Sequence, residues 1–374
     1  MVPFNQKYYT GNELAYMKAC MESGRISGDG EFTAKCQRML EAKYHFKKTF
    51  LTTSCTDALE MSALLLNIQE GDEVIAPSYA FVSTVNPFVL RGARIIFADS
   101  MPDHPNIDVD QIESLISTKT KAIVIVHYAG VAVDMDKLLA LAQNHGLVVV
   151  EDAAHAIDSY YKGKALGSIG TFGAFSFHDT KNVISGEGGM LVVNEEKFIS
   201  RAEIIREKGT NRSEFFRGEV DKYGWTDIGS SYLPSDLIAA FLFAQLEAIE
   251  TIQHRRLEIW KRYHAALQSI SISGAFKTPA IPSYASNNAH VYYLVTASLE
   301  ERTELMRFLK GKGISSAFHY LSLHKSPFFS NQYNGSELPN SDKFSDCLLR
   351  LPLYFDLSIQ QQDFVTQNIL DFYC

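Results

Sequence analysis

The chain has 374 residues, a net charge of −8 and a hydrophobic content of 46%, which are ordinary values for a folded protein of about two domains. It has no basic run and no apolar stretch long enough to cross a bilayer, so neither nucleic acid nor a membrane is an expected partner. The first residues lack the charged and apolar regions of a signal peptide. Scattered cysteines without metal-like spacing predict reduced thiols in a cytoplasmic protein and no metal site: Cys20, Cys36, Cys55, Cys347 and Cys374.

Two helices are predicted near the N-terminus, over residues 12–23 and 31–44. The hydroxyl-rich turn at residues 50–56 then opens another helix. Free amide groups and the helix dipole at such an N-terminus bind phosphate, so Cys55 and Thr56 are candidate phosphate contacts. A plain helix N-cap is the alternative, because Ser, Thr and Asp are the usual N-cap residues.

Strands and helices alternate in the next part of the chain. The expected strands are residues 72–76, 93–99, 122–128 and 146–152, and the expected helices are residues 108–117 and 134–145. Near-continuous apolar strands in repeated βα units predict an α/β fold with a mostly parallel sheet and helices on both faces. Phe81 follows the first of these strands, and it is either a ring that stacks on a flat ligand or an ordinary core residue.

Asp152 ends the strand at residues 146–152, at the sheet edge where open α/β proteins bind ligands. Mostly small residues follow it, with little bulk to block a ligand. A carboxylate at this place can keep a pyridinium nitrogen protonated, which makes pyridoxal phosphate an electron sink. An acidic helix cap after the strand is the alternative.

Lys181 lies between an aromatic run at residues 174–177 and a glycine cluster at residues 186–189. A lysine in semi-apolar surroundings has a lowered pKa, and its amine can be the nucleophile that a Schiff base requires. A solvated lysine in a loop is the alternative. The spacing between Asp152 and Lys181 favours a cofactor-binding site over this alternative. Residues 174–177 and 189–193 are expected to be further strands, the second of them antiparallel.

The second half of the chain begins with a helix at residues 195–206. The polar loop that follows, residues 208–225, either carries a substrate's phosphates, with Lys208 and Arg212 as candidates, or contacts another subunit. A long helix at residues 235–270 is expected to join the large domain to a smaller one.

The smaller domain is expected to alternate strand and helix, with strands at residues 291–297 and 315–320 and helices at residues 303–312 and 364–372. Near its middle, His319, Tyr320 and His324 are candidates to face the cleft and bind substrate. A purely structural role is the alternative, because histidines at strand ends are often structural.

The motifs at residues 151–155 (EDAAH), 176–181 (SFHDTK) and 186–189 (GEGG) resemble those of the nucleotide-sugar aminotransferases of the DegT type, which are fold-type I pyridoxal-phosphate enzymes. The resemblance runs the full length of the chain. It implies pyridoxal 5′-phosphate as the cofactor, a large cofactor-binding domain over residues 1–245 and a smaller C-terminal α/β domain over residues 246–374.

The resemblance also implies a role for each matching residue. Lys181 matches the Schiff-base lysine and Asp152 matches the partner of the pyridinium nitrogen. The remaining positions that match cofactor contacts are His155 near the phenolic oxygen, Ser176, Cys55 and Thr56 at the phosphate, and Phe81 on the ring. Two positions depart from the common pattern: Cys55 stands where many members have glycine, and Ser231 stands where many place an asparagine that reaches a neighbouring subunit's phosphate.

Longer matches at residues 206–213 and 227–233 are similar to the members that aminate dTDP-4-dehydro-6-deoxyglucose. They imply L-glutamate as the amino donor, a dTDP-linked keto-sugar as the acceptor, and a homodimer with the active site at its interface. Lys181 favours transamination, because related sugar dehydrases carry histidine there. A gluco-configured product, a 3-keto-sugar acceptor and a cofactor-binding regulator without activity are the alternatives.

Overall fold

The computed structural model describes residues 1–272 and 274–373, so the predicted free thiol at Cys374 lies outside the described residues. The helices are α1 (Glu13–Glu22), α2 (Glu31–Tyr44), α3 (Cys55–Leu65), α4 (Asn86–Leu90), α5 (Val109–Ile112), α6 (Met135–His145), α7 (Ile199–Arg206), α8 (Arg212–Phe216), α9 (Asp236–Glu247), α10 (Ile249–Ile272), α11 (Leu299–Gly311), α12 (Pro339–Cys347) and α13 (Ile359–Tyr373). The strands are β1 (Lys48–Thr52), β2 (Glu73–Pro77), β3 (Arg94–Ala98), β4 (Thr120–Val126), β5 (Val148–Asp152), β6 (Tyr160–Tyr161), β7 (Lys164–Ala165), β8 (Phe172–Ser176), β9 (Gly189–Val193), β10 (Tyr292–Val295) and β11 (Leu348–Leu351).

The large domain is built on a seven-stranded sheet with the order β1-β9-β8-β5-β4-β2-β3. The pairs β2–β3, β2–β4, β4–β5 and β5–β8 are parallel, and β9 runs antiparallel to both β8 and β1. The expected mostly parallel sheet with an antiparallel exit is therefore confirmed. Strand β5 lies in the middle of this sheet, so its last residue, Asp152, stands beside the ends of β4 and β8.

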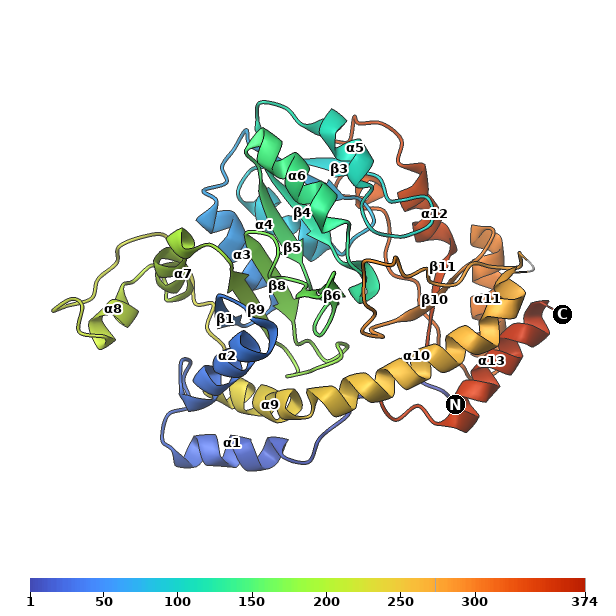
Figure 1. The fold of residues 1–374 in the computed structure, drawn as a ribbon, viewed down its shortest axis with the longest axis horizontal. Coiled ribbons are helices and arrows are strands. Elements are labelled where there is room, and N and C mark those ends of the chain that lie inside the picture. Colours follow the sequence, from blue (N-terminus) through green and yellow to red (C-terminus); the bar gives the residue numbers. More distant parts are fainter. Residues whose placement is uncertain (273, 374) are drawn as a thin grey trace.

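Both faces of the sheet are buried, which explains why the central strands β4 and β5 contain near-continuous apolar runs, Ala122–Val126 and Val148–Val150. In β4, Val124 packs with α3, α4 and α7 on one face, while Ile123 and Ile125 pack with α2, α6 and α9 on the other. Figure 1 shows these two helical layers around the sheet. The prediction of helices on both faces is confirmed.

The smaller domain contains the β10–β11 pair, α11, α13 and the far end of α10, around a core that includes Tyr263, Leu305 and Val365. Helices α9 and α10 run along one side of the molecule and connect the two parts of the chain (Figure 1). The N-terminal segment begins at the smaller domain and runs to the large one, since Val2 pairs with Ile314 and belongs to the core of the smaller domain.

Three differences from the predicted elements stand out. The helix expected at residues 235–270 is two helices that meet at Ala248. The strand expected at residues 315–320 is wrong: only Ala317 pairs, with Arg350, and the carbonyl of His319 is instead bound by tyrosine hydroxyls of the large domain. Strand β11 and helix α12 were not predicted.

The four described cysteines are free and buried: Cys20, Cys36, Cys55 and Cys347. In residues 1–272 and 274–373, no helix combines the length and the apolar character needed to cross a membrane. The same residues contain no group of three or more histidine, cysteine, aspartate or glutamate side chains arranged to hold a metal ion.

Candidate active site

A cavity of about 460 Å³ lies at the carboxyl ends of the parallel strands, where the smaller domain meets the large one. This volume is within the range typical of small-molecule sites. The cavity brings together most of the residues selected from the sequence: Cys55, Thr56, Phe81, Asp152, His155, Ser176, Lys181, His319 and Tyr320. The smaller domain also contributes Arg350 to the wall.

Lys181 stands in the loop that connects β8 to β9, and this loop is folded against itself. The Phe177 N–H donates to Gly188 O at 2.8 Å, and the Lys181 N–H donates to His178 O at 2.9 Å. Burial lowers the pKa of the Lys181 amine to about 8 from 10.5. A held backbone and a lowered pKa are what a nucleophilic lysine needs, and the prediction of a semi-apolar setting is confirmed.

Asp152 presents its carboxylate to the cavity from the end of β5. Thr84 Oγ1 donates to Oδ2 at 2.7 Å, and the Ala154 N–H donates to Oδ1 at 3.1 Å. Burial raises the pKa of the Asp152 carboxyl, while these hydrogen bonds and the charge of Lys181 act in the opposite direction. A buried carboxylate fixed by two donors is well placed to pair with a protonated ring nitrogen.

The N-terminus of α3 opens into the same cavity. Ser54 caps it by accepting the Asp57 N–H at 3.1 Å, so the predicted cap and the predicted phosphate turn are the same structure. Strand β9 passes so close that a Cβ on Gly189 would lie 2.2 Å from the carbonyl carbon of Ser54. Glycine at this position therefore allows β9 to approach the turn, which explains one member of the glycine cluster.

Hydroxyl groups surround this helix end. Thr56 Oγ1 donates to Ser83 Oγ at 2.8 Å, and Ser176 Oγ accepts the His178 N–H at 3.3 Å. Burial raises the pKa of the neighbouring Cys55 thiol, which keeps it uncharged. Free amide groups, a helix dipole and neutral donors form a suitable cradle for a phosphate.

His155 lies beside Asp152 and is held as a neutral ring. Its Nδ1 accepts the Ala129 N–H at 3.3 Å, so the proton is on Nε2, which donates to the Tyr320 hydroxyl at 3.2 Å. Burial lowers the pKa of His155 well below its usual range. A neutral ring at the cavity wall is consistent with the position expected near a phenolic oxygen.

Phe81 is not a core residue. The residue is 53% exposed and lines the cavity, and the centre of its ring lies 5.6 Å from the centre of the Tyr320 ring. The alternative of ordinary core burial is thus contradicted, and a ring that can cover a flat ligand is consistent with this position.

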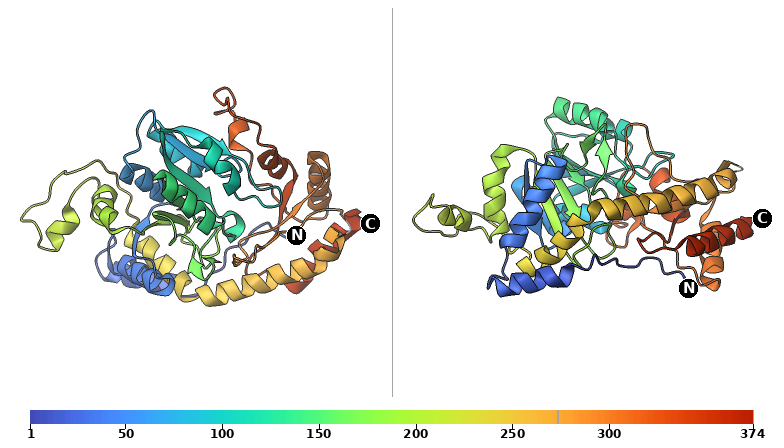
Figure 2. Two further views of the ribbon diagram at one scale, coloured as in Figure 1. Left: turned by 45° about the horizontal axis from the view of Figure 1, so that its top comes forward. Right: turned by 60° about the horizontal axis from the view of Figure 1, so that its bottom comes forward.

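Four candidates lie outside this cavity in the described chain. Lys208, Arg212 and Ser231 belong to the segment 208–231, which we call the arm; it projects from the body of the protein and carries α8 (Figures 1 and 2). Lys208 and Arg212 contact Glu207, at 3.7 Å each. His324 is buried, its Nδ1 lies 2.7 Å from Ser78 Oγ, and it connects the smaller domain to the end of β2.

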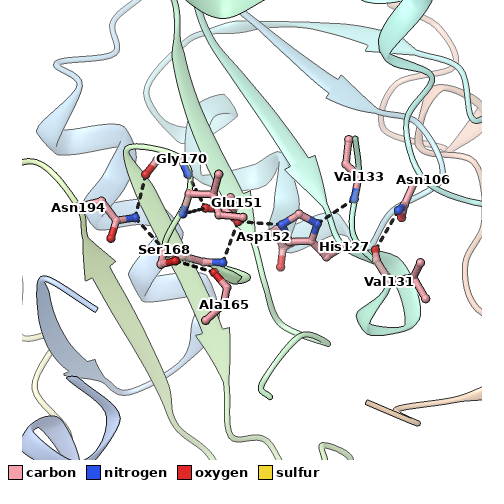
Figure 3. Close-up of polar contacts among 12 residues, drawn as sticks. Asn106, His127, Val131, Val133, Glu151, Asp152, Ala165, Ser168, Gly170 and Asn194 are labelled. Atoms are coloured by element: carbon pink, nitrogen blue, oxygen red, sulfur yellow. Dashed lines mark hydrogen bonds and ion pairs between the residues drawn. The ribbon is translucent and has the colours of Figure 1, made fainter. Parts of the chain in front are cut away.

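A buried network supports the end of β5 from behind the cavity (Figure 3). Glu151 Oε1 accepts the N–H groups of Ile169 and Gly170, and its Oε2 accepts the Gly167 N–H at 2.7 Å. His127 Nδ1 accepts the Val133 N–H, so its Nε2–H donates to Glu151 at 2.9 Å. These contacts fix the residue next to Asp152 and thereby the direction of the strand end.

Several cavity residues were missed from the sequence. Thr84 and Ser83 lie in a short turn after Phe81 and carry no motif, while His290 and Arg350 come from the smaller domain. A sequence signal existed for one of them, because Arg350 interrupts an apolar run with a single charge. The others are brought in only by tertiary structure.

These residues fit pyridoxal phosphate. The buried carboxylate of Asp152 can take the ring nitrogen, the α3 N-terminus can take the phosphate, and Lys181 supplies the amine. The fold and the site together define a pyridoxal-phosphate-dependent aminotransferase.

Comparisons with known proteins give the family. The sequence model of the DegT/DnrJ/EryC1/StrS aminotransferase family matches residues 7–370, and the chain belongs to this family. The spore coat polysaccharide biosynthesis protein SpsC of Bacillus subtilis is 32% identical, with 99% of this chain and 96% of that protein covered.

Solved structures agree over the full length. The PMP form of the protein Spr1654 of Streptococcus pneumoniae has a TM-score of 0.93 at 26% identity, covering 100% of this chain and 99% of that chain. The aminotransferase TlmJ of Streptoalloteichus hindustanus has a TM-score of 0.90 at 27% identity, with the same coverage. The chain is thus a sugar aminotransferase, and the resemblance, the fold class and the cofactor predicted from the sequence are confirmed.

Proposed function

We propose that this protein transfers the amino group of L-glutamate to C4 of dTDP-4-dehydro-6-deoxy-D-glucose. The products are dTDP-4-amino-4,6-dideoxy-D-galactose and 2-oxoglutarate. The observation that carries the proposal is the convergence of Lys181, Asp152 and the α3 N-terminus on one cavity. The choice of sugar is supported by the segments 206–213 and 227–233, which resemble dTDP-4-amino-4,6-dideoxygalactose transaminase, an enzyme of enterobacterial common antigen precursor synthesis. The name of the relative SpsC, a polysaccharide biosynthesis protein, is consistent with such a product.

The chemistry follows from the positions of the side chains. Pyridoxal phosphate, when bound, supplies an electron-withdrawing ring that stabilises the carbanion left after proton loss from a substrate carbon. Lys181 Nζ, with its pKa near 8, removes the proton from Cα of glutamate and later returns a proton at C4 of the sugar. Asp152 would hold the positive charge of the ring nitrogen, and Phe81 would cover the ring face. His155, whose Nε2–H donates to the Tyr320 hydroxyl, would stand near the phenolic oxygen.

We propose that the arm serves a second copy of the chain. Its aromatic side chains are exposed, with Phe216 at 67%, Tyr223 at 52% and Trp225 at 85%. Exposed aromatic groups on a projecting segment are typical of a contact surface. In a homodimer, Ser231, Lys208 and Arg212 would then reach the partner's cavity, where they would bind the cofactor phosphate or the sugar nucleotide. The free cysteines support our placing of this enzyme in the cytoplasm.

The first experiment is a product assay. The purified protein is incubated with pyridoxal phosphate, L-glutamate and dTDP-4-dehydro-6-deoxyglucose, and the product is identified by NMR. An axial amine at C4 supports the proposal. An equatorial amine contradicts the galacto configuration, and no product contradicts the choice of keto-sugar, in which case the 3-keto isomer and UDP-linked sugars are assayed next.

Two variants make the assay specific to the site. Lys181→Ala should abolish turnover, because no other amine replaces Nζ. Lys164→Ala removes an exposed lysine from the β6–β7 hairpin and should leave turnover unchanged. Full activity in Lys181→Ala would mean that the mechanism is wrong.

A further inference from the structure

Thr84 ends the short turn Val82–Thr84, which follows Phe81 at the cavity wall. Its N–H donates to the Phe81 carbonyl at 3.0 Å, and the next residue, Val85, is buried in the core of the large domain. Thr84 lines the cavity, although only 1% of the residue is exposed. The turn therefore holds a hydroxyl group at a fixed place in the cavity wall.

The hydroxyl of Thr84 donates its one proton to the carboxylate of Asp152. The distance from Oγ1 to Oδ2 is 2.7 Å, and the Ala154 N–H donates to Oδ1 at the longer distance of 3.1 Å. Within residues 1–272 and 274–373, these are the two hydrogen bonds that Asp152 accepts, one on each oxygen. An ionised carboxylate has about four acceptor sites, so each oxygen can still accept a bond from a ligand in the cavity.

The carboxylate of Asp152 has no ion-pair partner in the described part of the chain, where the neighbouring His127 contacts Glu151 instead. A buried charge without a partner is costly. Burial raises the pKa of the Asp152 carboxyl, and the hydrogen bond from Thr84 is the largest effect that opposes this rise. Because a hydroxyl carries no charge, Thr84 stabilises the carboxylate without neutralising it. Asp152 therefore keeps its capacity to pair with a cation.

The other ionisable groups that face Asp152 do not replace this hydrogen bond. The charge of Lys181 also opposes the rise in the Asp152 pKa, but less than the hydrogen bonds do, and His127 has a smaller effect still. Burial raises the pKa of the Cys55 thiol and of the Tyr320 hydroxyl, so both groups are neutral and supply no positive charge.

We propose that Thr84 is a positioning residue for the cofactor: it holds the Asp152 carboxylate in place and negatively charged, so that it pairs with the protonated ring nitrogen of pyridoxal phosphate. The inference rests on the proposed role of Asp152. Without the hydroxyl, the carboxylate is a stronger base. One proton then leaves the ring nitrogen and joins a carboxylate oxygen, which leaves an uncharged ring beside an uncharged carboxyl group.

The test compares two cofactors that differ at one ring position. Cofactor-free protein is titrated with pyridoxal phosphate and with its 1-deaza analogue, in which C–H replaces the ring nitrogen, and both dissociation constants are measured by absorbance. Their ratio reports the pairing at the ring nitrogen, because the other groups of the cofactor are the same. Thr84→Val keeps the shape and removes the donor, and it should reduce the preference for pyridoxal phosphate about 10-fold or more. Thr84→Ser keeps the donor and should retain the preference.

A second readout follows the proton itself. Holoenzyme that contains pyridoxal phosphate labelled with ¹⁵N in the ring is measured by NMR at one neutral pH. The wild type and Thr84→Ser should show the chemical shift of a protonated ring nitrogen, and Thr84→Val should show a shift displaced towards that of neutral pyridine.

The control is Thr366→Val, which removes another buried threonine hydroxyl. Thr366 lies in α13, away from the cavity, and donates to the Gln362 carbonyl at 3.0 Å. Both readouts should be unchanged in this control. Binding of the deaza analogue shows that a variant is folded. If Thr84→Val does not fold, Thr84→Ala, which also removes the donor, takes its place.

Three results would count against the inference. A folded Thr84→Val protein that keeps the wild-type preference and the wild-type ¹⁵N shift would overturn it. Equal weakening of both cofactors in Thr84→Val would also overturn it, because a general loss of shape affects both. If the wild type does not prefer pyridoxal phosphate to the deaza analogue, the proposed role of Asp152 is wrong and the inference fails with it. That failure is distinguishable, because it is seen without any substitution.

Discussion

Replacement of Lys181 by methionine should stabilise the cofactor-free protein at neutral pH. The amine lies in a partly buried setting, where its pKa is about 8 compared with 10.5 in water. Below pH 8, the folded and unfolded chains both carry the proton, so the folded chain bears the full penalty of a buried ammonium. The difference in pKa corresponds to at most about 3 kcal/mol of unfolding free energy, because the partial exposure of the side chain reduces the penalty.

The sign of the pH dependence follows from the same two pKa values. Between pH 8 and 10.5, the folded chain loses the proton while the unfolded chain keeps it, so this site makes the wild type more stable as pH rises. Methionine has no proton to lose. The stability advantage of Lys181→Met should therefore be largest at pH 7 and shrink as the pH approaches 10.5.

Urea denaturation of the two cofactor-free proteins at pH 7, 8, 9 and 10 measures this difference, with protein concentration held fixed. Lys164→Met provides the control, because it removes an exposed lysine and should show no pH-dependent difference from the wild type. The reasoning is refuted if Lys181→Met is less stable than the wild type at pH 7, or if its advantage does not change with pH.

Two further predictions concern the scaffold of the site. Glu151→Ala leaves His127 and three backbone N–H groups, two of them buried, without an acceptor, and it should lower the unfolding free energy by about 3–5 kcal/mol. A smaller loss than that of Glu151→Gln would contradict this. Gly189→Ala places a Cβ against Ser54 and should cost about 1–3 kcal/mol and weaken cofactor retention, measured by urea denaturation and by dialysis. Gly311→Ala, with no atom within 4 Å of the added Cβ, should do neither, and an equal loss in both variants would refute the steric explanation.

The large domain could be predicted well because short stretches of its sequence specify its strands and helices. The apolar runs that became β4 and β5 alternate with amphipathic helices, and this pattern determines a parallel sheet. Helix α2 has the predicted bounds, residues 31–44, and α6 is capped by Asp134, the residue at which that helix was predicted to begin. The place of Asp152 could be predicted from the same pattern, because the carboxyl end of a central strand lies at the edge of the sheet where ligands bind.

The smaller domain was predicted less well, for a physical reason. Its segments depend on contacts with the large domain more than on their own periodicity. Residues 315–320 have a strand-like composition, yet the Tyr79 and Tyr128 hydroxyls bind the His319 carbonyl, so the chain follows the large domain rather than a strand partner. Helix α12 is likewise fixed from outside, because Asp99 accepts the N–H groups of Asn340 and Ser341 at its start.

The two sides of the cavity differ in how visible they are in the sequence. Lys181 and Asp152 belong to motifs of one domain that lie close together along the chain, so the sequence allowed them to be recognised together. Arg350 lies on the smaller domain and meets them only through tertiary structure. A single arginine inside an apolar strand is nevertheless a usable signal, because a buried cation is unfavourable unless other groups compensate its charge, and the other residues of β11 are leucines. Such an arginine therefore indicates a strand that faces a polar cavity rather than an apolar core.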